Sequence, residues 1–451
     1  MIARVQSVVA WAALGVVLLS VLALGGNRPP AWLALTGAVC TLLVVQLTTD
    51  VAAPGRRESS RALLVPALLF VGVLVWATLQ AVAGWAPGGW QHPAWELVET
   101  KGAIAVDPIA ARHHLLRLIS YAAVFWIAMR AAEDRRRARR LVMAIALFST
   151  ALAIYGLATA VVGWNPITAV AGGSAGPVTA SFVNRNSYAT YAAFGLLANL
   201  AAWILVMEDE RMDDAAKTTR QFVRDLLASL GRRGWPFAVG ALICGLAIAA
   251  GQSRAGAGAA VIGVLALFVA RGRGGGSSAR VAFAGVALGI VIVVATSAGG
   301  LTERLLTTSG EDARFLAYPR ILDAIAERPW LGYGLGGFED GFRAHVPVAA
   351  ATAEWDLAHS SYLENIFELG VAAAAVFYAV LLLIVVRLAR GVAERRRDRI
   401  LPAFALACAA VAGVHSLVDF SLQMPASAAL FAFVLGLGWT QSFRSYSARG
   451  P

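Results

Sequence analysis

The chain has 451 residues, of which 59% are hydrophobic and only 14% are charged, with a mean hydropathy of +0.68. Soluble globular domains carry about 25% charged residues, so this composition argues against an ordinary soluble fold and indicates an all-α polytopic membrane protein. The net charge of +11 lies mostly in short arginine clusters between apolar runs, a pattern typical of membrane topology rather than of nucleic-acid binding. The three cysteines fall inside apolar runs and show no disulfide or metal-ligand spacing.

Apolar runs of about 17–25 residues are long enough to cross a bilayer, and twelve such runs follow one another along the chain. We therefore expect a single integral membrane domain over residues 1–451. The first run is expected to be an uncleaved span rather than a secretory signal. The expected spans are residues 5–25, 31–49, 62–83, 115–130, 141–162, 187–206, 236–251, 255–270, 281–298, 361–386, 401–417 and 425–441.

The distribution of basic residues predicts the orientation of these spans. With both termini in the cytoplasm, 27 of the 38 lysines and arginines lie in inner segments, as the positive-inside rule requires. The inner segment 207–234 is expected to be a charged, amphipathic loop at the bilayer surface. All six histidines fall on the outer side, and the largest outer segment, residues 299–360, is inserted between the ninth and tenth spans.

The large outer loop has a helical pattern that ends at Pro329 and that Pro319 interrupts, so a regular helix is expected only from Pro319 onward. The following GYGLGG, residues 332–337, formally matches G-x-G-x-x-G. It lacks the strand and helix of a dinucleotide site, so a turn or a close backbone approach to a glycan is the better interpretation. Ser361 and Glu364 have capping-box spacing, which predicts a helix start directly after the preceding histidine.

Two arginines stand in polar breaks at the outer ends of spans. Arg254 follows Ser253 in GQSRAG, where small neighbours would let a phosphate approach the guanidinium. The alternative is a side chain that snorkels from the end of a span. Arg185 stands between Asn184 and Asn186 at the expected start of the sixth span. That donor cluster suits an anion or a sugar, and the alternative is simple N-capping.

The outer loop and the eleventh span supply further candidates. Arg314 and Arg320 lie on the loop helix and could reach a cavity below it, with contact to lipid headgroups as the alternative. His359 stands at a positive helix end and is the candidate general base, with a structural interfacial histidine as the alternative. His415 and Asp419 are four residues apart and could pair with each other. The histidines lack metal-ligand spacing, so neither a metal nor another cofactor is expected.

The order of these motifs resembles the O-antigen ligase/polymerase family over roughly residues 140–440. The motifs are NRNS, SRAG, Arg314-x-x-x-Tyr318, ERPWLGYGLGGF, AHSSYLENIFELG and HSLVDF. Members of this family are multi-pass glycosyltransferases of the bacterial inner membrane with a large periplasmic loop late in the chain. Two positions depart from the family pattern, Tyr318 in place of tryptophan and Ser360 in place of asparagine, and neither removes a charge.

The resemblance implies a GT-C-like fold and a metal-independent, inverting transfer from undecaprenyl pyrophosphate at the periplasmic face of the bilayer. The acceptor hydroxyl belongs to lipid A-core in ligases of lipopolysaccharide biosynthesis and to another glycan in polymerases, and some relatives glycosylate proteins. Arg185, Arg254 and Arg314 would bind the pyrophosphate, and His359 and Arg254 would be the catalytic residues. The expected supporting residues are Asn184, Asn186, Ser253, Arg320, Gly334, Gly336, His415 and Asp419.

A transporter or channel for anionic glycans is the alternative of another class. It would need charged residues through several spans, whereas few charges lie in mid-span and the polar motifs cluster at one face. The sequence also shows no inverted repeat. We therefore expect an enzyme, with a lipid-linked glycan donor, a lipid A-core or glycan acceptor and the lipid bilayer as its partners.

Overall fold

The computed structural model describes residues 1–52, 58–98, 100–171, 176–210, 234–272, 312–346, 355–395 and 398–443. These residues form helices and connecting segments, with no β-strand among them. Residues 281–298, expected to be the ninth span, lie outside the described residues, as does most of the inner loop 207–234.

The long helices follow the expected spans. Among the described residues, six helices are long and apolar enough to cross a membrane, and three more are apolar but shorter. The structure is therefore that of a helical membrane protein, while the count of twelve spans and the GT-C-like fold stay predictions. The six are α1 (Ile2–Ser20), α2 (Pro29–Ala52), α4 (Leu64–Ala81), α6 (Arg135–Val162), α8 (Arg185–Glu210) and α17 (Val371–Glu394); the three are α10 (Trp235–Ala250), α11 (Arg254–Gly272) and α18 (Ile400–His415).

The remaining elements complete the bundle and its connections. Two further helices of the bundle are α5 (Pro108–Ala131) and α19 (Pro425–Gln441). The short α-helices are α3 (Glu58–Ala62), α7 (Pro166–Ala169), α14 (Asp312–Glu327), α15 (Phe338–Phe342) and α16 (Ser361–Leu369). Single 3-10 turns are η1 (Leu24–Gly26), η2 (Gly88–Trp90), η3 (Pro93–Leu97), η5 (Arg343–His345) and η7 (Ser421–Gln423).

Helix α8 lies at the centre of the bundle, where it packs against α6, α10, α11 and α18. Within its most apolar stretch 94% of the residues are buried, compared with 22% for α17 at the periphery. Small residues allow this close packing. A Cβ atom on Gly195 would lie 2.4 Å from Ser149 on α6, and one on Gly263 would lie 2.4 Å from Val411 on α18. Membrane helices associate through such close packing contacts, because the surrounding lipid is itself apolar and the hydrophobic effect does not drive the helices together.

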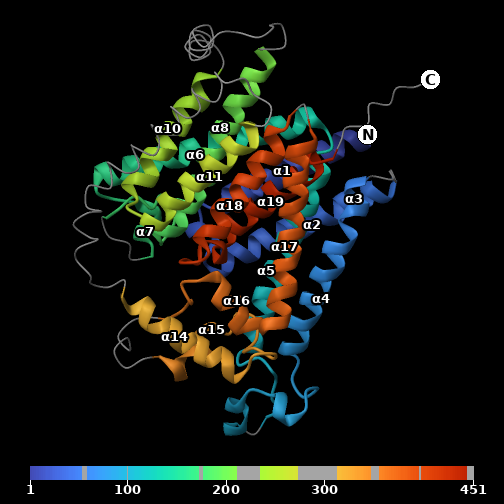
Figure 1. Ribbon diagram of the computed structural model, residues 1–451, viewed down its shortest axis with the longest axis vertical. Coiled ribbons are helices and arrows are strands. Elements are labelled where there is room, and N and C mark those ends of the chain that lie inside the picture. Colours follow the sequence, from blue (N-terminus) through green and yellow to red (C-terminus); the bar gives the residue numbers. More distant parts are fainter. Residues whose placement is uncertain are drawn as a thin grey trace.

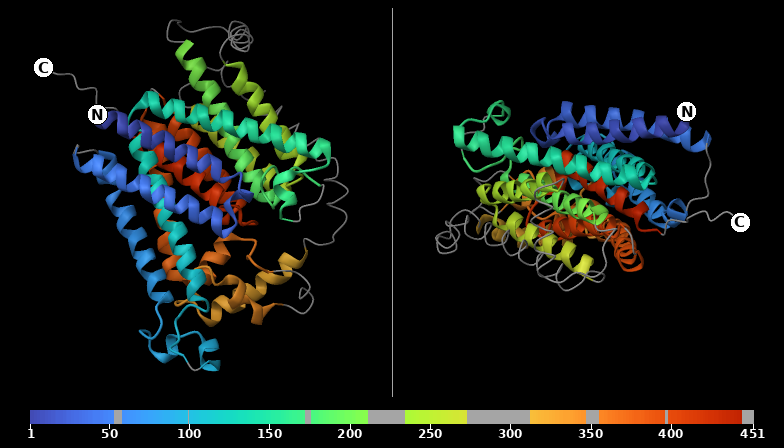
Figure 2. Two further views of the ribbon diagram at one scale, coloured as in Figure 1. Left: turned by 180° about the vertical axis from the view of Figure 1, so that it is seen from behind. Right: turned by 90° about the horizontal axis from the view of Figure 1, so that it is seen from above.

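The two ends of the bundle carry different elements (Figure 1). The start of α1 and the end of α19 lie at one end, and α14, α15 and α16 lie at the other, together with the segment between α4 and α5 (Figures 1 and 2). We call the three helices α14, α15 and α16 the cap. Which end faces the periplasm stays a prediction from the charge distribution.

The cap has a small apolar core of its own. Tyr333 stacks on Phe367 with ring centroids 4.1 Å apart, and Ala317 and Ile321 of α14 are fully buried beneath them. Helix α14 continues through Pro319, so the expectation that a regular helix begins only there is wrong. Burial on both sides of the proline compensates for the backbone hydrogen bond that it cannot donate.

The run expected as the tenth span, residues 361–386, is split into two helices. Helix α16 ends at Leu369 and α17 begins at Val371, with Gly370 between them at φ +78°. The Val371 N–H donates to the Pro329 carbonyl at 2.8 Å, and a Cβ on Gly370 would lie 2.4 Å from the Trp330 carbonyl oxygen. Only glycine fits this turn. Because the helix is broken at Gly370, we assign α16 to the cap and only α17 to the membrane-spanning bundle.

Candidate functional site

Three polar motifs that are distant in the sequence meet where the cap joins the bundle. The Asn186 side-chain amide, in the first turn of α8, donates to the Asp419 carboxylate at 3.1 Å. One turn further along α8, the Thr190 hydroxyl lies 2.5 Å from Nδ1 of His415. From the start of α16, the Ser361 hydroxyl donates to the Asp419 backbone carbonyl at 3.1 Å. These contacts fix the start of α8, the end of α18 and the start of α16 against one another.

The buried side chains His415 and Asp419 are joined through a third residue. Ser421 donates to the Asp419 carboxylate, and its hydroxyl lies 3.2 Å from Nδ1 of His415. His415 is 1% exposed and Asp419 is fully buried. Ser421 therefore links the two residues of the predicted pair. Neither Ser421 nor Thr190 was predicted from the sequence, although Thr190 lies four residues after Asn186 on the same helix face.

His359 occupies an unusual backbone conformation beside this cluster. Its φ is +53°, a region that residues other than glycine rarely adopt and that is frequent at functional sites. The Tyr318 hydroxyl of α14 donates to its carbonyl at 3.1 Å, and its ring lies 4.9 Å from the ring of Phe420. Cap and bundle thus hold this histidine between them.

The start of α16 differs from the predicted capping box by one residue. The N-cap is Ser360, whose hydroxyl accepts from the Leu363 N–H at 3.5 Å. The left-handed turn at His359 places Ser360, rather than Ser361, in the extended conformation that an N-cap requires. Glu364 reaches further back and accepts from the Ala358 N–H at 3.0 Å. The predicted helix start directly after the histidine is nevertheless confirmed.

Arg185 and Arg254 are each the first residue of a helix. Asn184 caps α8 by accepting from the Asn186 N–H at 2.7 Å, so the N-capping interpretation holds for this asparagine. Ser253 caps α11 in the same way by accepting from the Gly256 N–H at 3.1 Å. The two helix starts lie side by side, since a Cβ on Gly256 would be 2.4 Å from Ala189 of α8. Two positive helix ends, each with an arginine, are therefore adjacent.

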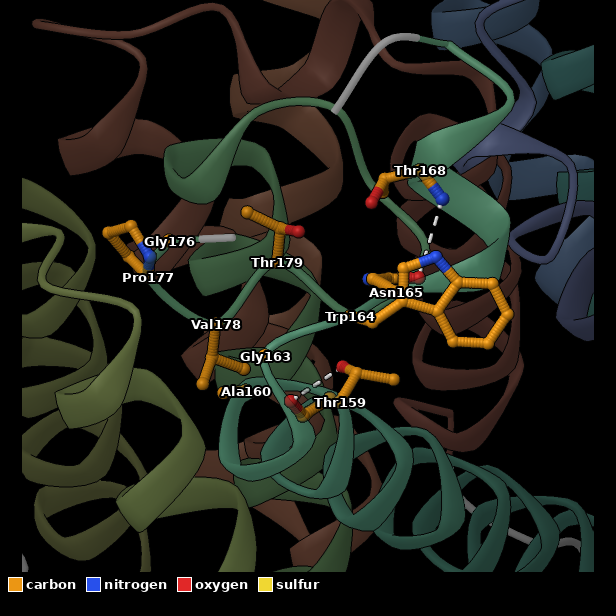
Figure 3. A pocket seen from close by; sticks show the side chains of 11 residues that line it. Thr159, Ala160, Gly163, Trp164, Asn165, Thr168, Gly176, Pro177, Val178 and Thr179 are labelled. Carbon is orange, nitrogen blue, oxygen red and sulfur yellow. Dashed lines mark hydrogen bonds between the residues drawn. The ribbon is translucent and has the colours of Figure 1, made fainter. Parts of the chain in front are cut away.

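The segment that leads into α8 lines a small cavity (Figure 3). Its volume is about 30 Å³, and its walls come from the end of α6 and from residues 163–168 and 176–179, including Asn165 and Thr179. Such a volume holds one or two water molecules and no sugar ring. The Val178 N–H donates to the Ala250 carbonyl at 3.2 Å, so this segment also supports the end of α10 just before Arg254.

The two arginines predicted on the loop helix lie on α14. The side chain of Arg314 is outside the described residues. Arg320 is 59% exposed and forms a surface ion pair with Asp323 at 3.4 Å. This exposed position favours the alternative given above, in which Arg320 contacts lipid headgroups, over a role in the cluster around Asp419.

The glycine turn after α14 encloses a buried carboxylate. The backbone N–H groups of Gly336 and Phe338 donate to the Glu368 side chain, and the Gly334 N–H donates to the Glu368 carbonyl at 2.9 Å. Burial raises the pKa of Glu368 to about 7 despite these hydrogen bonds. Burial and the neighbouring Glu368 also raise the pKa of Glu364. This buried acidic pair on α16 was not predicted from the sequence.

The glycines of this turn pack tightly against the segment between α4 and α5 and the start of α5. A Cβ on Gly334 would lie 2.3 Å from that of Ala105, and one on Gly336 would lie 1.9 Å from Nδ1 of His114. Both glycines also have positive φ. The backbone at these two glycines therefore closely approaches other residues of the protein, and not a glycan as expected.

Residues 239–378 match a family model that is described as O-antigen ligase. The matched stretch includes most of α10, then α11, the cap and the first residues of α17, and it contains Arg254, Arg314 and His359. Arg185, His415 and Asp419 lie outside it but contact or adjoin its helices. No curated protein sequence matches the chain at a significant level.

Proposed function

Since residues 239–378 carry the O-antigen ligase domain, we propose that this membrane protein transfers a glycan from undecaprenyl pyrophosphate to an acceptor hydroxyl. The main support for this proposal is that the starts of α8 and α11 meet the segment around His359 where the cap joins the bundle. The arginine-headed starts of α8 and α11 lie side by side, and the Asn186–Asp419 hydrogen bond joins α8 to the segment that holds His359.

The leaving group of this reaction is a lipid-bearing diphosphate, which has to be held at the level of the headgroups. Arg185 and Arg254 bind its oxygens at two positive helix ends, and the guanidinium geometry suits bidentate contact. Arg314 of α14 contributes a third cation from the cap. Preorganised cations stabilise the charge that develops on the diphosphate, so the transfer proceeds without a metal ion.

The acceptor hydroxyl attacks the anomeric carbon from the side opposite to the diphosphate. The new glycosidic bond forms as the bond between the anomeric carbon and the phosphate oxygen breaks, and the electron pair leaves with undecaprenyl pyrophosphate. The hydroxyl proton passes to the imidazole of His359, which acts as general base. This geometry inverts the configuration at the anomeric carbon.

Asn186, Thr190, His415, Asp419 and Ser421 act as positioning residues in this account. Their hydrogen bonds connect the start of α8 to the segments on either side of α16, which keeps Arg185 and His359 at a fixed separation. Hydrogen bonds between buried side chains hold elements in one arrangement, because another arrangement would leave these polar groups unpaired.

The acceptor class can be tested with the purified protein in a bilayer. We propose a ligase that uses lipid A-core at the periplasmic face of the inner membrane, so a lipid-linked donor should release undecaprenyl pyrophosphate when lipid A-core is added. Release only with a repeat-unit glycan would identify a polymerase. Movement of glycan across a liposome membrane without any transfer would contradict the enzymatic proposal.

A further inference from the structure

A second cationic cluster lies on α5 and the start of α2, two helices that cross and pack against each other in the bundle (Figure 2, left). The Arg117 guanidinium lies over the ring of Trp32, 4.7 Å from its centroid. The ring of His113 is 5.3 Å from the same tryptophan, and Trp32 itself is 1% exposed. His114 also contacts Arg117, with Nε2 3.3 Å from its Nη1. The guanidinium therefore has a defined position.

The positive charge of this cluster has no carboxylate partner among the described residues. Arg117 and its neighbour Arg112 form no ion pair there, and the buried Nε of Arg117 has no hydrogen-bond acceptor. The acidic residue nearest in sequence, Asp107, caps α5 by accepting from the N–H groups of Ile109 and Ala110. Leaving a buried charged donor unsatisfied is costly, so the site calls for an anionic ligand.

The cluster opens toward lipid. Ile109, Leu116 and Ile119 recur at helical spacing along α5 and are 63%, 41% and 36% exposed, which marks an apolar outer face. Arg112 and His113 are exposed on that same face. In a membrane protein an exposed apolar face contacts acyl chains, so cations within it stand at the level of the headgroups.

We propose that Arg117, with Arg112 and His113, binds the phosphate of a membrane lipid headgroup. The Trp32 ring covers one face of the Arg117 guanidinium, which leaves its planar edge to donate to phosphate oxygens. Arg112 supplies a second charge from the exposed face. The phosphate belongs either to an anionic phospholipid or to a phosphorylated glycolipid, since both present the same group at this depth.

The proposal is tested by lipid retention, measured by native mass spectrometry on the full chain purified in mild detergent. Phosphatidylglycerol should remain bound while phosphatidylcholine is lost. Arg117→Gln and the exposed Arg112→Gln should each weaken retention, Arg117→Gln by about tenfold or more. Arg343→Gln is the matched control, because that arginine is 67% exposed and paired with Glu339 and Asp340 in the cap.

Competition with a bis-phosphorylated lipid A separates the two sources. Displacement of phosphatidylglycerol from the wild-type protein would identify the glycolipid, and resistance to displacement would identify the phospholipid. Equal retention of phosphatidylglycerol by the wild type, Arg117→Gln and Arg112→Gln would overturn the proposal. So would equal retention of phosphatidylcholine and phosphatidylglycerol by the wild type.

Discussion

The side-chain amide of Asn186 donates to the carboxylate of Asp419 at 3.1 Å, across 233 residues of sequence. This hydrogen bond connects the start of α8 to the buried Asp419–Ser421–His415 group. Replacing Asn186 by Asp should set two carboxylates against each other and lower the free energy of unfolding by about 1–3 kcal/mol. Thermal unfolding of the purified protein in detergent measures this loss.

The exchanged pair Asn186→Asp with Asp419→Asn restores one donor and one acceptor at this contact. The double variant should therefore lose less free energy of unfolding than the two single variants lose when their losses are added. Strictly additive losses would show that the two side chains do not interact.

Gly336 is predicted to tolerate no side chain. A Cβ there would lie 1.9 Å from Nδ1 of His114, and the residue has φ +75°. Gly336→Ala should destabilise the protein by about 1–3 kcal/mol, because overpacking and backbone strain add. Gly88→Ala is the matched control, since its Cβ would meet nothing within 4 Å, and its melting temperature should equal that of the wild type. Equal melting temperatures for both variants would refute the packing described at the turn.

The stability of the cap should depend on pH through Glu368. Its pKa is about 7 in the folded protein, compared with an ordinary value of 4.5 for a glutamate side chain, so the folded state binds the proton more tightly. The resulting stabilisation is fully present below the unfolded pKa and is lost as the pH rises through about 7. Hydrogen exchange in α15 and α16 should be faster at about pH 8.5 than at about pH 6.5, after correction for the intrinsic rate.

Glu368→Gln should weaken this pH dependence and leave the contribution of Glu364, whose pKa burial also raises, whereas the exposed Glu339→Gln should retain it in full. The partly buried His92, whose pKa is lowered from 6.5 to about 4 chiefly by burial, destabilises the folded state only as the pH falls from about 6.5 to about 4, so its effect lies outside this pH range. A cap that becomes more protected at about pH 8.5 would contradict the assignment.

The orientation of the chain is tested by reporter fusions. The charge distribution predicts that a periplasm-active reporter is active when fused after His345 and silent when fused after Gly275. The opposite pattern would place the cap and the proposed site in the cytoplasm.

Much of the helical fold could be predicted from hydropathy, because a bilayer demands long apolar runs whatever their neighbours are. The break at Gly370 could not, since residues 361–386 are apolar enough to be continuous. What ends α16 is the contact of Val371 with the Pro329 carbonyl, which depends on the folded cap. Long-range contacts of this kind leave no local signal.

The candidate site was predicted in part. The asparagines around Arg185 were recognised as candidate helix caps, because caps have local signatures. The serine before Arg254 was named only as a supporting residue, and its role as the cap of α11 was not predicted. The partner of Asn186 was not, since nothing in the sequence relates it to Asp419. The glycines at 334 and 336 suggested an approach to a ligand, whereas the backbone instead approaches Ala105 and His114.

The most direct test of the account is the release of undecaprenyl pyrophosphate by the purified protein, supplied with a lipid-linked glycan and an acceptor. Arg254→Ala should lower the rate about a hundredfold or more, because it removes charge stabilisation of the leaving group. His359→Ala should lower it by a similar factor through loss of the general base. Arg343→Ala, which removes an exposed arginine of the cap, should leave the rate unchanged. Unchanged transfer by both Arg254→Ala and His359→Ala would contradict the proposed mechanism.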